Sequence, residues 1–284
     1  MLALYDVPAP AKLNLFLHVT GRRPDGYHLL QSAFMLIDWC DTLDFERTGD
    51  GSISREDVGT ALPAEDLCVR SARALQEAAG CPWGVRIRLH KRIPAKAGLG
   101  GGSSDAASCL LALNRLWELR LPLRQLERIG LALGADVPFF LQGGNAWVEG
   151  VGEQIAPLEL PPARFLVAKP PSGLATEAVF THPGLKRDSE AAIISGFAAN
   201  PYGFGHNDLQ PVAQRLCPGV TQALQWLGSQ GLTGRMTGSG SAVFAKLPEG
   251  RANQALEPAP AGWQVRICGN LEAHPLVGWA PSDD

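Results

Sequence analysis

The chain has 284 residues, of which 45% are hydrophobic and 19% charged, and its formal net charge is −3. This composition excludes a disordered chain and gives no electrostatic footprint for nucleic acid or an anionic membrane. No apolar run of about 18 residues appears, and the first residues lack a basic stretch before an apolar core. We therefore expect a cytoplasmic protein that binds neither nucleic acid nor membranes.

The first predicted element is a strand after Pro10, in which apolar residues from Leu13 to Val19 alternate with polar ones. Lys12 and Asn14 should project together from the face opposite the core. A turn over 21–26 and a second strand over 34–39 are expected next. The polar stretch 48–65 suggests a loop or a short hairpin, and 67–79 suggests a helix that ends at Gly80.

The centre of the chain predicts a strand, a glycine-rich loop and a helix. Val85–Leu89 alternates as a half-buried strand, and the loop contains four glycines within 98–102. Apolar residues at helical spacing follow it, and Ser103, Ser104 or Asp105 could cap that helix. Glycine backbone N–H groups and a helix N-terminus together favour phosphate binding, although no Gly-Lys-Ser/Thr ends the run as in a Walker A loop.

The remaining elements mix helices and strands without regular alternation. Helices are expected over 123–133, ended by Gly134, and over 212–227, with a loop and short helix over 184–205. Strands are expected over 146–149 and 165–168, and a Gly-Ser loop over 235–246 should feed another. Prolines at 157, 161 and 162 favour a domain boundary. This pattern indicates the α+β class.

Cysteine spacing gives no sign of a metal site. The six cysteines are scattered, without a CxxC pair or nearby His spacing. A zinc site or a disulfide framework is therefore disfavoured, and free thiols in a reducing compartment are expected.

Lys12 and Asp136 are the candidate catalytic residues. A carboxylate that accepts a hydroxyl proton beside an ammonium group suits phosphoryl transfer to an alcohol. The residues alone leave alternatives open. Asp136 could be a helix cap with Pro138 in the first turn, and Lys12 could be an exposed strand lysine.

Three segments in order resemble the three motifs of the GHMP kinases, which include galactokinase and homoserine and mevalonate kinases. These segments are PAPAKLNLFL, IPAKAGLGGGSSDAA and RMTGSGSAVFA. The strings KLNLFLHVTGRRPDGYHLLQS, LGADVPFF and EGVGE are similar to the members of that family that act on a cytidine diphosphate ester of methylerythritol. The resemblance covers nearly the whole chain.

The resemblance implies a two-domain fold, with a ribosomal protein S5 domain 2-like part over 1–158 and a ferredoxin-like part over 159–284. It implies ATP-dependent phosphorylation of the 2-hydroxyl of 4-diphosphocytidyl-2-C-methyl-D-erythritol, in the non-mevalonate isoprenoid precursor pathway. Mg²⁺ should accompany ATP without a dedicated metal site, in a monomer or homodimer. The alternatives are a homoserine- or mevalonate-type kinase, or a non-catalytic nucleotide-binding protein on the same fold.

Site residues are also implied by the resemblance. Lys12 and Asp136 would form the catalytic pair. The ATP site would comprise Asp66, Lys91, Pro94, Ala95, Lys96, Ala97, Gly98, Leu99, Gly100, Gly101, Gly102, Ser103 and Ser104. The acceptor site would comprise Asn14, Tyr27, His28, Val151, Thr176 and Phe180, and the third motif Gly238, Ser239 and Gly240 would close beside the loop.

Some of these assignments have ordinary alternatives. Phe180 would stack on cytosine or be a core aromatic, and His28 would bond the pyrimidine edge or be a loop histidine. Asp66 stands where relatives usually have Asn near adenine, and an ionised carboxylate cannot donate a hydrogen bond. Lys96 would reach a phosphate or point to solvent.

Overall fold

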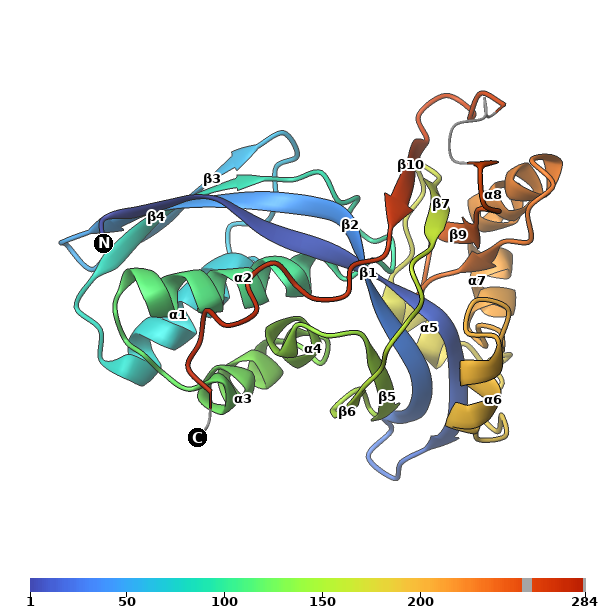
Figure 1. Cartoon of the computed structure of the whole chain (residues 1–284), viewed down its shortest axis with the longest axis horizontal. Helices are drawn as coiled ribbons and strands as arrows, with labels where there is room; N and C mark the ends of the chain where they lie inside the picture. The colour runs from blue at the N-terminus through green and yellow to red at the C-terminus, as the bar shows by residue number, and fades with distance from the viewer. Residues whose placement is uncertain (252–256, 283–284) are drawn as a thin grey trace.

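The computed structural model describes residues 1–251 and 257–282, and its strands form two sheets (Figure 1). The first is six-stranded, in the order β3-β4-β2-β5-β6 with β1 paired to β2, and the second is four-stranded, in the order β10-β7-β9-β8. The strands of the first sheet are β1 Ala3–Arg22, β2 His28–Thr48, β3 Ile53–Val58, β4 Gly84–His90, β5 Ala146–Gly150 and β6 Gln154–Pro157. Those of the second are β7 Arg164–Lys169, β8 Arg235–Met236, β9 Val243–Lys246 and β10 Gln264–Gly269.

Helices divide between the two sheets. One group packs beneath the first sheet in Figure 1, namely α1 Leu67–Ala79, α2 Gly101–Leu116, α3 Leu123–Leu133 and α4 Val137–Gln142. The other group lies to the right in Figure 1, with α8 against the second sheet and α6 beside the curved end of the β1–β2 hairpin. Its members are α5 Thr176–Thr181, α6 Ile194–Ala199, α7 Gln210–Leu216 and α8 Pro218–Ser229. Mixed helices and mainly antiparallel strands confirm the α+β class.

The long β1–β2 hairpin connects the two halves of the molecule, the first built around the six-stranded sheet and the second around the four-stranded sheet. Its register shifts at several bulges, among them one between Pro10 and Ala11, and bulges bend and twist a strand. The hairpin curves from the first sheet toward α6 in Figure 1. Asp208 N–H donates to the Leu17 carbonyl at 2.9 Å, which ties the second half to β1.

β1 departs from the expected one-sided strand because it is buried on both faces. Leu13 and Phe16 are both 0% exposed, and Lys12 is only 4% exposed. Phe16 packs among aromatic side chains of the second half, such as Phe197 and Phe204. The strand is therefore enclosed between two layers, and its polar residues are functional candidates rather than a solvated face.

Several local predictions are confirmed and others are wrong. α1 and α3 have the predicted bounds, with Gly80 in the left-handed conformation at the end of α1. The stretch 48–65 contains β3, parallel to β4, rather than a loop or hairpin. The helix expected over 212–227 is broken at Cys217, because the residue before a proline disfavours helical backbone. The expected cap of α2 is also wrong, since that helix already begins at Gly101.

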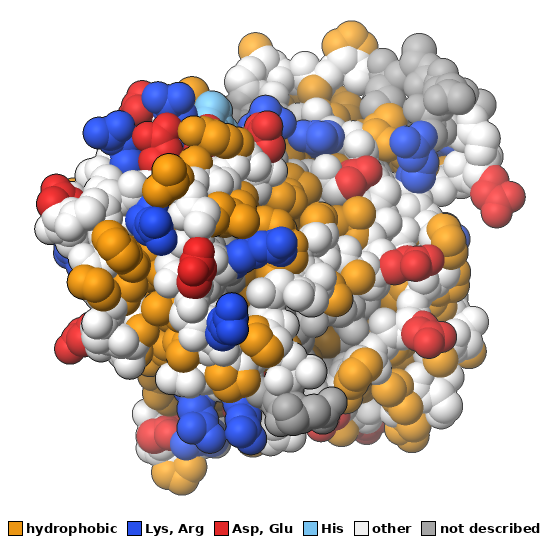
Figure 2. Space-filling model, turned by 60° about the vertical axis from the view of Figure 1, so that its left-hand side comes forward, with side chains coloured by type: hydrophobic (Ala, Val, Ile, Leu, Met, Phe, Trp, Pro, Cys, Tyr) orange, Lys and Arg blue, Asp and Glu red, His pale blue; other side chains and the backbone are white. Residues whose placement is uncertain are grey.

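The chain's last described segment returns to the first half (Figure 1). Leu271 N–H donates to Leu36 O at 2.9 Å, and His274 N–H donates to Gly143 O at 2.7 Å. Within the described ranges, none of the helices is both long and apolar enough to cross a membrane. Lys and Arg side chains are interspersed with Asp and Glu over the face in Figure 2.

Candidate active site

One cavity of about 710 Å³ collects most of the predicted site residues. It is lined by the predicted residues Lys12, Asn14, Asp66, Lys91, Pro94, Ala95, Lys96, Ala97, Gly98, Leu99, Gly100, Gly101, Gly102, Ser103, Asp136, Val151, Thr176, Phe180, Gly238, Ser239 and Gly240. Tyr27, His28 and Ser104 are not among its lining residues. Tyr27 is 65% exposed before β2, whereas Ser104 is 0% exposed inside α2.

The glycine-rich loop places the N-terminus of α2 at this cavity. Gly98 (φ +74°) and Gly100 (φ +72°) adopt the left-handed backbone that glycine tolerates, and Gly100 occupies the N-cap position of α2. Lys12 N–H donates to Leu99 O at 2.9 Å, which fixes the loop to β1. The unpaired N–H groups of the first turn of α2 therefore lie at the cavity, where an anion would bind.

The third motif packs directly against this loop. Ala242 N–H donates to Ala97 O at 3.0 Å. A Cβ on Gly98 would lie 2.2 Å from the Thr237 carbonyl oxygen, so the two backbones touch at a place where only glycine fits. The buried Asn207 side chain donates to Met236 O and Gly238 O at 2.9 and 2.8 Å. Asn207 was not predicted, because no local pattern marks it.

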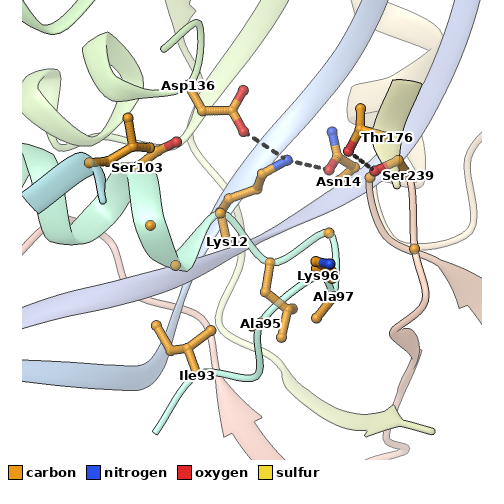
Figure 3. Close-up of a pocket in the computed structure, with 18 of the residues that line it drawn as sticks. Lys12, Asn14, Ile93, Ala95, Lys96, Ala97, Ser103, Asp136, Thr176 and Ser239 are labelled. Carbon is orange, nitrogen blue, oxygen red and sulfur yellow. Dashed lines mark hydrogen bonds and ion pairs between the residues drawn. The ribbon is translucent and has the colours of Figure 1, made fainter. Parts of the chain in front are cut away.

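Lys12, Asn14 and Asp136 meet at the centre of the cavity (Figure 3). The Lys12 ammonium lies 3.6 Å from an Asp136 carboxylate oxygen and donates to Asn14 Oδ1 at 2.5 Å. It also lies 4.2 Å from the centre of the Phe34 ring. Burial lowers the pKa of Lys12 below 10.5, and the charge of Asp136 opposes that effect.

The structure bears on the ordinary alternative for each catalytic candidate. Asp136 occupies the N-cap position of α4, yet its side chain makes no capping hydrogen bond and faces Lys12 instead. Its side chain is 32% exposed, against 5% for Lys12, so the carboxylate is the more accessible partner. The alternative that Lys12 is an exposed strand lysine is wrong, because Lys12 is buried. The Asn14 side-chain amide donates to Ser32 Oγ at 3.0 Å, and the Asn14 backbone N–H donates to Thr237 Oγ1 at 2.9 Å.

Lys91 is held by two buried carboxylates beneath the loop. Its ammonium donates to Asp105 Oδ2 at 2.7 Å and to Asp41 Oδ2. Burial raises the pKa of Asp105, and Lys91 opposes that rise. Asp41 also accepts from the backbone N–H of Ile93 at 2.8 Å. The sequence indicated Lys91 as an ATP-site residue and Asp105 only as a possible helix cap. The cluster ties β2, the chain after β4 and the N-terminal part of α2 together.

Asp66 has structural partners of its own. Its carboxylate accepts from Val69 N–H at 3.1 Å, which caps α1, and forms an ion pair with Arg55. Arg55 also bonds Asp57, with 2.6 Å between the nearest atoms. The adenine contact of Asp66 stays a prediction, now for a carboxylate that already has two partners.

The other end of the cavity is lined from α5. Thr176 Oγ1 and Ser239 Oγ lie 2.8 Å apart in a hydrogen bond that joins α5 to the third motif (Figure 3). Phe180 lines the cavity, and its ring centre lies 5.1 Å from that of His28. His28 therefore lies just beyond the cavity, beside its aromatic lining residue.

Comparisons with known proteins agree with this architecture. The family models for the N-terminal and C-terminal domains of GHMP kinases match residues 66–144 and 191–264. The chain is 67% identical to a 4-diphosphocytidyl-2-C-methyl-D-erythritol kinase from Albidiferax ferrireducens, over 100% of this chain and 98% of that protein. It is also 67% identical to one from Acidovorax sp. strain JS42, over 98% of this chain and 99% of that protein.

Solved structures give the same result. A crystal structure of 4-(cytidine 5'-diphospho)-2C-methyl-D-erythritol kinase is 35% identical, with a TM-score of 0.76 over 94% of this chain and 99% of that one. A homoserine kinase from Cytophaga hutchinsonii, at 16% identity and a TM-score of 0.69 over 96% of each chain, shares the fold. The chain belongs to the 4-diphosphocytidyl-2-C-methyl-D-erythritol kinases, a branch of the GHMP kinase family.

Proposed function

We propose that the protein transfers the γ-phosphoryl group of ATP to the 2-hydroxyl of 4-diphosphocytidyl-2-C-methyl-D-erythritol, giving the 2-phosphate and ADP. The observation that carries this proposal is the pairing of Lys12 and Asp136, 3.6 Å apart, beside the glycine-rich loop in one cavity. The cleft lies between the two parts proposed as domains, 1–158 and 159–284. The names of the relatives supply the acceptor.

Asp136 is proposed as the base. Its carboxylate makes no capping hydrogen bond and is the more exposed member of the pair, so an acceptor hydroxyl can reach it. The hydroxyl proton passes to this carboxylate as the oxygen bonds to the γ-phosphorus and the bond to the β-phosphate oxygen breaks. The buried Lys12 ammonium stabilises the negative charge that develops on the acceptor oxygen, and Asn14 keeps that ammonium in place.

The glycine-rich loop is proposed to hold the phosphates of ATP. Backbone N–H groups at the N-terminus of α2 and the adjoining third motif line the same cavity. Lys91 lies below the loop with two carboxylate partners, so its main contribution would be to hold the loop's shape. Asp66 would lie near the base of ATP.

The oxygen groups present fit Mg²⁺, which prefers oxygen ligands. The Ser103 hydroxyl belongs to a residue that lines the cavity in the first turn of α2. Over the described ranges, no cluster of three or more His, Cys, Asp or Glu residues is arranged to hold a metal. The phosphates would therefore supply most ligands. When bound, Mg²⁺ would neutralise charge on the transferring phosphoryl group.

The acceptor end is proposed to recognise cytidine. Phe180 would stack on the pyrimidine, with Tyr27 and His28 at its edge, and Val151 and Thr176 would also lie against the acceptor. Support comes from the contact of Phe180 with His28 and from the position of Thr176 beside Ser239.

A panel of alcohols tests the proposal. Purified protein is incubated with ATP, Mg²⁺ and one acceptor at a time, and ADP release is measured. We expect turnover with the cytidyl acceptor and little with homoserine or mevalonate. ADP release with either of those alcohols but not with the cytidyl compound would contradict the proposed acceptor. No phosphorylation of any of them, with ATP bound, would favour a non-catalytic nucleotide-binding protein.

A further inference from the structure

Arg187 has an unusual set of partners at the acceptor end of the cavity. Its guanidinium donates through Nε to the Nε2 atom of His28 at 3.0 Å. Its two terminal nitrogens donate to the carbonyl oxygens of Leu185, Phe180 and His182, at 3.0, 3.0 and 2.9 Å. Across the described part of the chain, no carboxylate forms an ion pair with it. Its hydrogen bonds therefore all go to neutral acceptors.

The bond between Arg187 and His28 fixes where the imidazole carries its proton. A guanidinium N–H can only donate, because an arginine side chain has no acceptor. The His28 Nε2 atom must then offer its lone pair, so in the neutral ring the proton resides on Nδ1. Burial and the nearby charge of Arg187 both lower the pKa of His28, which keeps the ring neutral. His28 thus retains one polar atom for a ligand, an N–H donor.

The same guanidinium also fixes the neighbouring wall of the site. Phe180 and His182 lie at the C-terminal end of α5, where arginine side chains commonly bond the last free carbonyls of a helix. Because the Arg187 guanidinium bonds both that helix end and His28, the rings of Phe180 and His28 keep their separation of 5.1 Å. Arg187 therefore sets the position of the aromatic ring and the chemistry of the imidazole beside it.

We propose that Arg187 is a positioning residue that sets pyrimidine specificity by holding His28 as its Nδ1–H tautomer. This inference rests on the proposed function. Cytosine presents an acceptor at N3, which complements a fixed N–H donor, whereas uracil carries a hydrogen at N3 and would meet it donor to donor. A site built on a fixed donor rejects the base that lacks the matching acceptor. The acceptor site would therefore prefer cytidyl over uridyl esters.

The first test reads the tautomer in the wild-type protein without any substitution. Nitrogen-15 spectra of the histidine rings, assigned with His28→Gln, show which ring nitrogen of His28 bears the proton. We expect the proton on Nδ1. A proton on Nε2 would overturn the proposal, whatever acceptor the enzyme uses. This measurement is therefore independent of the proposed function, which fails instead if the cytidyl compound is not phosphorylated.

The second test compares Arg187→Met and Arg187→Lys with Lys186→Met, which removes an exposed positive charge from the next residue. In Arg187→Met we expect His28 to shift toward the Nε2–H tautomer. We also expect the preference in kcat/KM for cytidyl over uridyl acceptor to fall about tenfold, roughly the worth of one hydrogen bond. Arg187→Lys, which keeps one donor, should retain part of both properties. The KM for ATP should not change.

Lys186→Met should leave the tautomer and the preference unchanged. An Arg187→Met protein that keeps both the Nδ1–H tautomer and the full preference would overturn the proposal. Equal losses in Lys186→Met would do so too, because they would trace the effect to charge rather than to the hydrogen bond. If Arg187→Met does not fold, the Lys variant and the wild-type spectrum still decide.

Discussion

Replacement of Gly98 by alanine should damage the glycine-rich loop far more than replacement of an ordinary left-handed glycine. Two costs add at this position. A non-glycine residue at φ +74° costs about 1–2 kcal/mol in backbone strain. The new Cβ would also lie 2.2 Å from the Thr237 carbonyl oxygen, a backbone atom that can only move with the third motif. Overpacking of this kind costs about 1–3 kcal/mol, so we expect a loss of about 2–5 kcal/mol.

Gly80→Ala provides the matched control. Gly80 has φ +57° at the end of α1, and a Cβ there would meet no atom within 4 Å. Only the strain term applies, so the free energy of unfolding should fall by about 1–2 kcal/mol. Urea unfolding gives the stability of both variants, and calorimetry gives their affinity for ATP. Gly98→Ala should weaken ATP binding at least about tenfold, because the loop and third motif must separate to accommodate the Cβ.

Two results would refute this reasoning. A Gly98→Ala protein no less stable than Gly80→Ala would show that the overlap is relieved at no cost. Wild-type ATP affinity in Gly98→Ala would show that the close contact of the loop with the third motif does not shape the ATP site. Unchanged ATP affinity in Gly80→Ala is the expected control result.

Three further predictions follow from other parts of the structure. Burial lowers the pKa of His274 to about 4, so the unfolded chain takes up a proton below about pH 6.5 that the folded protein excludes. The free energy of unfolding, measured with urea, should fall by about 3 kcal/mol from pH 6.5 to 4. If His274→Asn lost as much stability as the wild type over this pH range, the reasoning would be contradicted. Wild-type turnover should fall as pH rises through the lowered pKa of Lys12, because the ammonium loses its proton. Lys12→Arg should not show this fall at alkaline pH, because arginine does not titrate there. If the fall persists in Lys12→Arg, it belongs to another group. Asn207→Ala removes donors to two third-motif carbonyls and should raise the KM for ATP about tenfold, whereas a wild-type KM would show that the motif is held without it.

Local features of the fold were predictable from the sequence because their causes lie within a few residues. Gly80 ends α1 through its own left-handed backbone, and Gly98 and Gly100 adopt the same backbone in the loop before α2. The predicted single helix over 212–227 is broken at Cys217, although Pro218 stands in the sequence. At that position the proline decides the backbone of the residue before it.

Features that depend on distant contacts were harder to predict. The burial of Lys12 arises because β1 is enclosed from both sides, which alternation within one strand cannot reveal. Asp41, Asn207 and Arg187 act through partners far along the chain, and no local pattern distinguishes them from ordinary polar residues. The meeting of Lys12 with Asp136 was expected from the family resemblance rather than from spacing.

The account depends most on Asp136 as the base beside Lys12, and Asp136→Asn tests it directly. Asparagine keeps the size of the side chain but cannot accept the hydroxyl proton as a carboxylate does. Single-turnover rates with the cytidyl acceptor should fall by about 10²–10⁴, the usual contribution of a general base, while the affinity for ATP stays at the wild-type value. Turnover within about tenfold of wild type, with ATP bound normally, would contradict the account and leave Asp136 a positioning group.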